Sequence, residues 1–191
     1  MTKKITLLLL LIMPVFLLKA QNKYNGLIWS KGVLTWEYFQ ETEAIPGSHA
    51  LARTYMKLQL DIADNLHITE RGKELTVKVY ALMIPSFSYV KKGSAKNSVL
   101  GHEQMHFDIL ELAARQLRKE ILDAKLGLKD YERTIHKMNR RIWSDQQKMQ
   151  ARYDKEHRST DRGHNWWANF IKEELDKLDA YQATELSVLI L

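Results

Sequence analysis

The chain has 191 residues, which is enough for one domain with its own hydrophobic core. It contains no cysteine, so disulfides and thiolate metal sites are excluded, and any metal must be held by nitrogen and oxygen atoms. Because the net charge of +6 is mild and its cations are interleaved with acids, we expect no nucleic-acid partner.

Residues 1–20 have the layout of a secretory signal peptide. Two lysines near the start precede an apolar run, Ile5–Leu18, and Ala20 offers a small residue for cleavage. The alternative is an uncleaved membrane anchor, but the run is shorter than the about 20 residues that span a bilayer. We therefore expect a protein without a stable membrane anchor that is secreted or periplasmic, with residues 21–191 as a single domain. Removal of residues 1–20 takes away three lysines and leaves a charge of +3.

The first half of the mature chain has the period of β-strands. In "YMKLQLDI" (55–62) and "KELTVKVYALMI" (73–84), apolar and polar residues alternate, which is typical of a strand with one buried face. Arg71-Gly72 is a turn signal between two such runs. These patterns predict an antiparallel meander of residues 54–62, 66–70 and 74–84.

The second half has helical periodicity. Between Gly101 and Gly127 apolar residues recur at spacings of three and four, so one long helix is predicted to end near Ala124. A second helical stretch begins at Lys129, with a possible break at Ser144-Asp145, and a last amphipathic helix follows a predicted loop at 159–165. The fold class is therefore α+β: an antiparallel sheet from the N-terminal half, packed against the long helix and two or three further helices.

The long helix carries the sequence H-E-x-x-H at residues 102–106. On an α-helix, His102 and His106 lie one turn apart on the same side, where two imidazoles can hold adjacent corners of a tetrahedral zinc site. Glu103 falls beside the open corner, where a carboxylate can act as general base for water. The pattern predicts a Zn²⁺ site with Glu103 as the catalytic residue. A pair of histidines that bind no metal is the alternative interpretation.

The chain also resembles a bacterial family of predicted secreted zinc-dependent proteases that is filed as a domain of unknown function. The resemblance covers nearly the whole mature chain and rests on Leu34-Thr35-Trp36 with Phe39, Ser88-Tyr89-Val90, "HEQMHFDI" at 102–109, and Tyr153-Asp154-Lys155-Glu156. It implies a zinc-binding, zincin-like metalloprotease domain. Where the family shows Thr and then His after the last motif, this chain has His157-Arg158-Ser159, with a further histidine at His164.

The third metal ligand is therefore open among three residues. The apolar stripe of the second helix passes through Tyr153, and His157 continues it four residues later, so His157 is the first candidate. His164 is second and Glu156 third, the latter either as a ligand or as a group that orients a histidine. We expect the remaining histidines, His49, His67 and His136, to lie at the surface.

Other polar and aromatic residues near the motif have simpler interpretations. We expect Glu111 to be a solvated helix residue and Asp108 to orient a neighbour or pair with a base. Tyr153 is either a core tyrosine or a hydrogen-bond donor to a developing oxyanion. Trp36, Phe39, Trp166 and Trp167 are interpreted as core aromatics.

Together these features predict a secreted zinc metallopeptidase that acts on a peptide or protein substrate, with metal ligands His102, His106 and His157. The alternative is an exported binding or structural module without catalysis, in which zinc is absent or only structural. A closed site with four protein ligands would favour that alternative, because structural zinc leaves no position for water.

Overall fold

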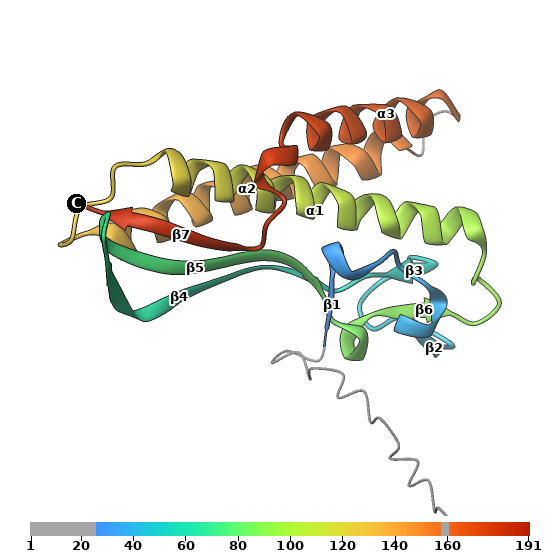
Figure 1. Ribbon diagram of the computed structural model, residues 1–191. Coiled ribbons are helices and arrows are strands. Elements are labelled where there is room, and N and C mark those ends of the chain that lie inside the picture. Colours follow the sequence, from blue (N-terminus) through green and yellow to red (C-terminus); the bar gives the residue numbers. More distant parts are fainter. Residues whose placement is uncertain (1–25, 158–160) are drawn as a thin grey trace, which may run out of the picture.

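Two long antiparallel strands form the body of the main sheet in the computed structural model, which describes residues 26–157 and 161–191 (Figure 1). β4 (Met56–Thr69) and β5 (Gly72–Met83) run in register from Met56 opposite Met83 to Thr69 opposite Gly72. Gly72 has a φ of 128°, a conformation that side chains other than glycine rarely adopt, and it closes the tight turn. The predicted strands 54–62 and 66–70 are one strand, with a register shift between Ile62 and Leu66.

Two further strands pair with β5, both antiparallel. β1 (Leu27–Ile28) pairs with its carboxyl end, and β7 (Glu185–Ile190) pairs with residues 73–78. β7 was not predicted, although its sequence alternates: Leu186, Val188 and Ile190 are buried and the residues between them are exposed. The second half of the chain therefore completes a sheet that the first half begins.

A second, smaller sheet lies below the amino end of α1 (Asn97–Asp123) (Figure 1). Its central strand is β6 (Tyr89–Lys91), with β2 (Gln40–Thr42) parallel to it on one side and β3 (Ala52–Arg53) antiparallel on the other. β3 is therefore an edge strand, and it leads directly through Thr54 into β4.

The α-helices in the described part of the chain are α1, α2 (Tyr131–His157) and α3 (Asp161–Lys177). The same residues contain four 3₁₀ turns: η1 (Trp29–Lys31), η2 (Trp36–Tyr38), η3 (Pro85–Phe87) and η4 (Asp179–Tyr181). α2 runs without a break through Ser144-Asp145. The backbone of α3 begins at Asp161, so most of the predicted loop 159–165 is helical. Within residues 26–157 and 161–191, no helix is long and apolar enough to cross a membrane. The predicted signal peptide, 1–20, lies outside the described residues.

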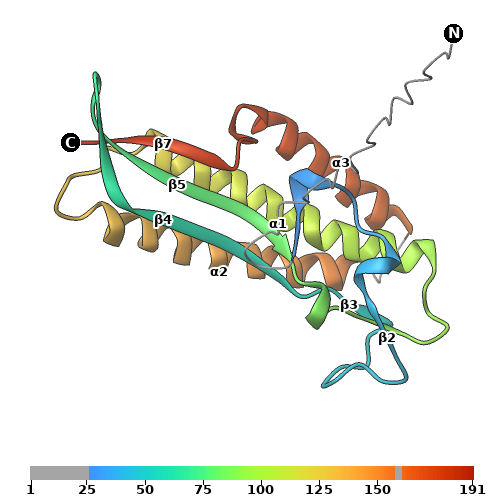
Figure 2. The same cartoon turned by 60° about the horizontal axis from the view of Figure 1, so that its bottom comes forward.

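α1 is the central element of the fold, because three apolar clusters meet around it. One joins its carboxyl half to β5, β7 and α2, a second joins Phe107 and Leu110 to β1, β3 and β6, and a third joins Met105 and Ile109 to α2 and α3. Figure 2 shows the sheet in front and the helices behind it. The predicted fold class, an α+β arrangement with the sheet packed on the long helix, is confirmed.

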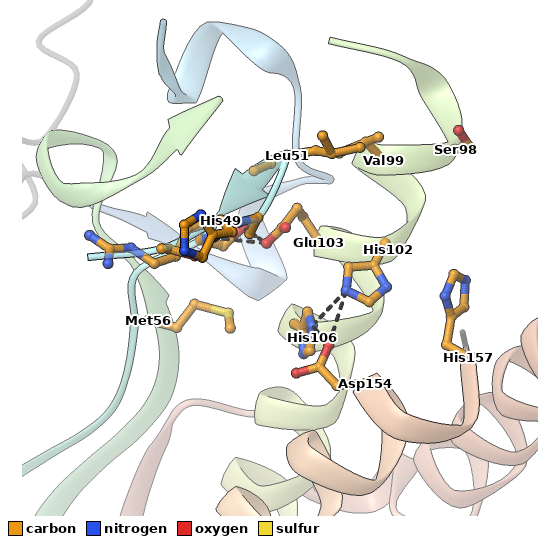
Figure 3. Close-up of a pocket in the computed structure, with 15 residues that line it drawn as sticks. His49, Leu51, Met56, Ser98, Val99, His102, Glu103, His106, Asp154 and His157 are labelled. Atoms are coloured by element: carbon orange, nitrogen blue, oxygen red, sulfur yellow. Dashed lines mark hydrogen bonds and ion pairs between the residues drawn. The ribbon is translucent and has the colours of Figure 1, made fainter. Parts of the chain in front are cut away.

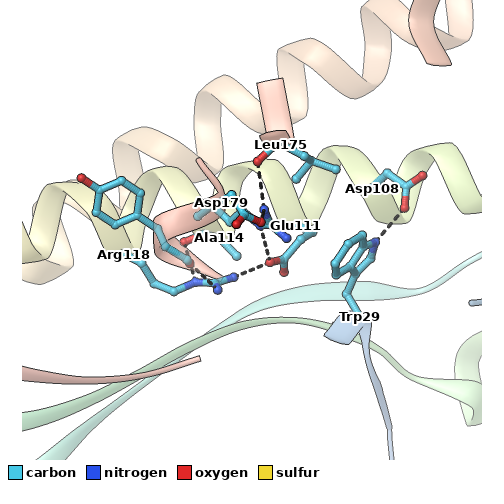
Figure 4. Close-up of polar contacts among 9 residues, drawn as sticks. Trp29, Asp108, Glu111, Ala114, Arg118, Leu175 and Asp179 are labelled. Atoms are coloured by element: carbon cyan, nitrogen blue, oxygen red, sulfur yellow. Dashed lines mark hydrogen bonds and ion pairs between the residues drawn. The ribbon is translucent and has the colours of Figure 1, made fainter. Parts of the chain in front are cut away.

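Glu111, expected to be solvated, is instead buried at 1 % exposure in a charged network on α1. Its Oε1 atom lies 2.6 Å from Arg118 and 3.2 Å from Arg115. The two guanidinium groups also donate to the carbonyls of Tyr181 (2.7 Å) and Leu175 (2.9 Å), which fixes the end of α3 and η4 on α1 (Figure 4). The expectation for Glu111 was wrong because its burial depends on Arg115 and Arg118, which are buried with it.

Candidate metal centre

Three donor atoms from two helices converge at one point. His102 and His106 lie one turn apart on α1, and their Nε2 atoms are 3.0 Å from each other. Asp154 comes from α2, and its Oδ1 atom lies 3.2 Å from both of these nitrogens. Figure 3 shows the carboxylate of Asp154 and the ring of His102 on either side of His106. Among the described residues, these three side chains form a group that could bind a metal ion.

The geometry and chemistry of these donors fit Zn²⁺. In a tetrahedral site with metal–ligand bonds of about 2.0–2.1 Å, neighbouring donor atoms are separated by about 3.3–3.4 Å. The three observed separations of 3.0–3.2 Å are within a few tenths of an ångström of that value. Two imidazole nitrogens and one carboxylate oxygen are ligands typical of zinc, and three protein ligands leave a fourth position for water or substrate.

The electrostatics of the cluster favour an ionised carboxylate. Hydrogen bonds with His102 and His106 hold the pKa of Asp154 well below its usual range. Burial acts to lower the pKa of His106, but its contacts with Asp154 and Gln150 and the charge of Glu103 together raise it above 6.5. The site therefore holds negative charge that a cation would neutralise.

Glu103 lies beside the cluster and is held by the edge of the small sheet. Its Oε2 atom accepts hydrogen bonds from the backbone N–H of Thr54 at 3.0 Å and from its hydroxyl at 2.6 Å. The N–H of Lys91 donates to Leu51, so alternate residues of β3 face β6, and Thr54 directs its N–H to the opposite edge. Glu103 is only 5 % exposed, and its carboxylate accepts the backbone hydrogen bond that a neighbouring strand would otherwise accept from Thr54.

An open cleft of about 720 Å³ connects this site with solvent. The three donors and Glu103 form one side, and the segment from Ser48 to Thr54 forms the other. Leu51, Met56 and Val99 add apolar surface to the walls (Figure 3). A ligand could therefore reach the metal position.

The structure brings most of the predicted site residues together. His102, Glu103, His106 and His157 all line the cleft. The ring of His157 stands 4.8 Å from that of His102 between centroids, but His157 is outside the group of three converging donors. Its role as a metal ligand stays a prediction.

The other candidate ligands are placed differently. Glu156 pairs with Arg152 at 2.8 Å and accepts a hydrogen bond from the indole of Trp167 at 3.1 Å. The side chain of His164 lies outside the described residues. The predicted surface positions of His67 and His136 are confirmed, and His49 is exposed on the wall of the cleft.

Asp154 was missed as a candidate ligand although the quoted motif contains it. The signal was available in the helical spacing, because Gln150, Asp154 and His157 follow one another at intervals of four and three and share a face of α2. The inward apolar stripe of α2, through Met149 and Tyr153, lies on the adjacent face. The prediction of the third ligand followed that stripe and therefore passed over Asp154.

Tyr153 lies behind the two histidines as a buried core residue. Its ring is 4.9 Å from that of His102 in a stacked arrangement and 5.0 Å from that of His106, edge to face. Burial raises the pKa of the Tyr153 phenol. Trp167 packs against the far side and is fully buried, whereas Trp166, expected in the core, is 47 % exposed. Tyr153 thus packs behind the rings of the two candidate metal-binding histidines.

The remaining polar residues of the H-E-x-x-H segment hold the N-terminal part of the chain. Asp108 accepts a hydrogen bond from the indole of Trp29 at 2.7 Å (Figure 4). It also accepts one from the side-chain amide of Gln104 at 2.7 Å. Gln104 in turn accepts from the backbone N–H of Leu34 at 2.8 Å. Asp108 therefore orients Trp29 and Gln104 rather than a candidate metal ligand or a basic residue, and the "HEQ…D" and "LTW" motifs are in contact.

Comparison with protein-family models gives a match over the part of the chain that contains this site. Residues 94–164 match the model of a family described as a bacterial protein of unknown function (DUF922). The matched segment spans α1 and α2 and includes His102, Glu103, His106, Asp154 and His157. No curated protein and no solved structure gives a match. The description of that family names no activity.

Proposed function

We propose that the protein is an exported zinc-dependent metallopeptidase, with Zn²⁺ held by His102, His106 and Asp154. The observation that carries this proposal is the convergence of three zinc-type donors, 3.0–3.2 Å apart, at the wall of an open cleft. A bound zinc ion supplies a Lewis acid that activates water and polarises a carbonyl. With three protein ligands, the site retains the open position that catalysis needs.

Glu103 is the general base of the proposed reaction. Its carboxylate lines the same cleft as the ligands, and Thr54 donates two hydrogen bonds to its Oε2 atom. Glu103 accepts a proton from the attacking water and later passes it to the leaving amine. The bonds from Thr54 keep the carboxylate in one orientation while it does so.

The test is zinc analysis and hydrolysis of unstructured peptides by the mature protein, residues 21–191, together with Glu103→Gln. The glutamine retains an oxygen that can accept both bonds from Thr54, so the fold is preserved. We expect zinc at one ion per chain in both proteins, and loss of turnover by a factor of at least about 100 in the variant. Full activity of Glu103→Gln would remove this residue from the mechanism.

One observation favours a second candidate, a non-catalytic module with structural zinc. The ring of His157 lies 4.8 Å from that of His102 between centroids, so His157 is close enough to be considered as a fourth protein ligand. Zinc bound by four protein ligands, without hydrolysis of any peptide, would support this candidate. X-ray absorption of the zinc-loaded protein counts the ligands directly.

A further inference from the structure

Gln150 contacts His106 at two points from the neighbouring helix. Its side-chain Nε2 atom donates to the backbone carbonyl of His106 at 2.8 Å, and its Oε1 atom contacts Nδ1 of the same imidazole. Asp154, one turn further along α2, contacts the other ring nitrogen, Nε2, at 3.2 Å. One face of α2 therefore contacts both nitrogens of His106.

These contacts determine where the imidazole carries its proton. A carbonyl oxygen can only accept a hydrogen bond, so the NH₂ end of the Gln150 amide must face the carbonyl of His106. The Oε1 end then faces Nδ1, and since Oε1 is also only an acceptor, Nδ1 must carry hydrogen. A neutral imidazole has one N–H, which leaves the lone pair on Nε2 at the point where the three donor atoms converge. The hydrogen bond from Nε2 to Asp154 forms only in the imidazolium, which carries hydrogen on both nitrogens.

We infer that Gln150 is a positioning residue that selects the metal-binding tautomer of His106. This inference rests on the metal site of the proposed function. A neutral amide performs this task without placing a second negative charge next to that of Asp154. The charge of the ligand set then stays at −1, so a bound divalent cation keeps a net positive charge.

His102 provides an internal contrast. Its Nδ1 atom is buried and has no hydrogen-bond partner among the described residues. The two histidines of the motif are therefore unequal: His106 is fixed from outside the cluster, whereas packing against Tyr153 orients the ring of His102. Loss of Gln150 should weaken the site through His106.

The experiment compares Gln150→Leu with Gln147→Leu in the mature protein. Both glutamines lie on α2, but Gln147 is exposed and does not contact the cluster, so it controls for the change of an amide to an apolar side chain. The first measurement is the ¹⁵N NMR spectrum of the metal-free protein at alkaline pH, which identifies the protonated nitrogen of each neutral imidazole. The second is the zinc dissociation constant, measured by competition with a chelator.

We expect His106 to carry hydrogen on Nδ1 in the wild type and in Gln147→Leu, and to lose this preference in Gln150→Leu. Zinc affinity should fall about 10–100-fold in Gln150→Leu and stay unchanged in Gln147→Leu. Gln150→Glu, which keeps an acceptor for Nδ1–H, should retain the tautomer even if leucine disturbs the packing. Hydrogen on Nε2 in the wild type, or equal zinc affinity in both leucine variants, would overturn the inference.

These readouts separate the inference from the proposed function, because neither requires turnover. A protein that binds zinc in a Gln150-dependent manner but hydrolyses no peptide would support the role of Gln150 and contradict the peptidase. Hydrolysis with a zinc affinity that does not depend on Gln150 would contradict only the role of Gln150.

Discussion

Thr54 donates two hydrogen bonds to a single oxygen of Glu103, one from its backbone and one from its hydroxyl. A helix residue that is proposed to transfer protons is thus held by the short segment that joins β3 to β4. Because hydrogen bonds to a charged group contribute about 1.5–3 kcal/mol, removal of one should be measurable.

Thr54→Val removes the hydroxyl and keeps the backbone donor. We expect the free energy of unfolding to fall by about 1–2 kcal/mol and turnover to fall, because the carboxylate loses a donor and its fixed orientation. Thr54→Ser keeps the hydroxyl and should restore both. Urea denaturation and peptide hydrolysis measure the two effects. A valine variant as stable and as active as wild type would show that the hydroxyl is dispensable.

Asp154→Asn tests the ligand set. We expect zinc affinity to fall by at least about 100-fold, a larger loss than the 10–100-fold typical of groups that only orient a ligand. Glu156→Gln is the control, because Glu156 pairs with Arg152 and Trp167 instead. Zinc titrations of these variants and of His157→Ala decide between Asp154 and His157 as the third ligand. Loss of zinc in His157→Ala, with retention in Asp154→Asn, would support the ligand predicted from the sequence.

Zinc binding and metal-free stability should depend on pH in opposite directions above about pH 6.5. Ligand histidines must lose their protons to bind zinc, so affinity increases with pH. Because the pKa of His106 is raised above 6.5, weakening on acidification should begin at a higher pH than for an ordinary histidine. Competition titrations at several pH values measure this trend.

The metal-free protein follows the pKa shifts of the same cluster. The raised pKa of His106 contributes stability below 6.5 that is lost as pH rises through its folded value. The lowered pKa of Asp154 contributes stability above 3.8 that is lost as pH falls through its folded value. The cluster should therefore stabilise the metal-free chain most between about pH 4 and 6.5. Melting temperatures measured in a chelator test this, and a cluster contribution that increases above that window would contradict it.

Arg118→Ala tests the buried charged network. It leaves Glu111 buried beside only Arg115 and removes the bond to the carbonyl of Tyr181. We expect a loss of about 3–5 kcal/mol in the free energy of unfolding, as for other broken buried ion pairs. The neighbouring exposed pair is the control: Lys119→Ala should cost less than about 1 kcal/mol. Urea denaturation measures both losses. Equal losses would show that the buried ion pair of Arg118 contributes no more to the free energy of unfolding than the exposed pair.

The elements with regular periodicity could be predicted from the sequence. Alternation identified β4 and β5, and the spacing of apolar residues identified α1 with His102 and His106 on one side. These features depend only on neighbours along the chain, so local physics determines them. The same reasoning placed Glu103 and His157 close to the two histidines.

The missed features depend on how separate elements pack. Helical spacing puts Asp154 on the same face as His157, but the sequence does not show that this face is turned toward His102 and His106. That depends on the rotation of α2 against α1, which the apolar clusters between these helices determine. Glu111 looks like a surface acid until Arg118 is seen to be buried with it. The hydrogen bond from Thr54 to Glu103 joins residues that are 49 positions apart in the sequence, and no local pattern indicates it.

The division of the ligand set between α1 and α2 has a thermodynamic consequence. A metal that joins His102 to Asp154 would tie together two segments that separate when the chain unfolds, and so would act as a reversible cross-link. Since only the folded chain presents the complete set, each tenfold rise of free metal above its dissociation constant would add about 1.4 kcal/mol to the folding equilibrium. The metal supply of the compartment would then set how long the protein survives there.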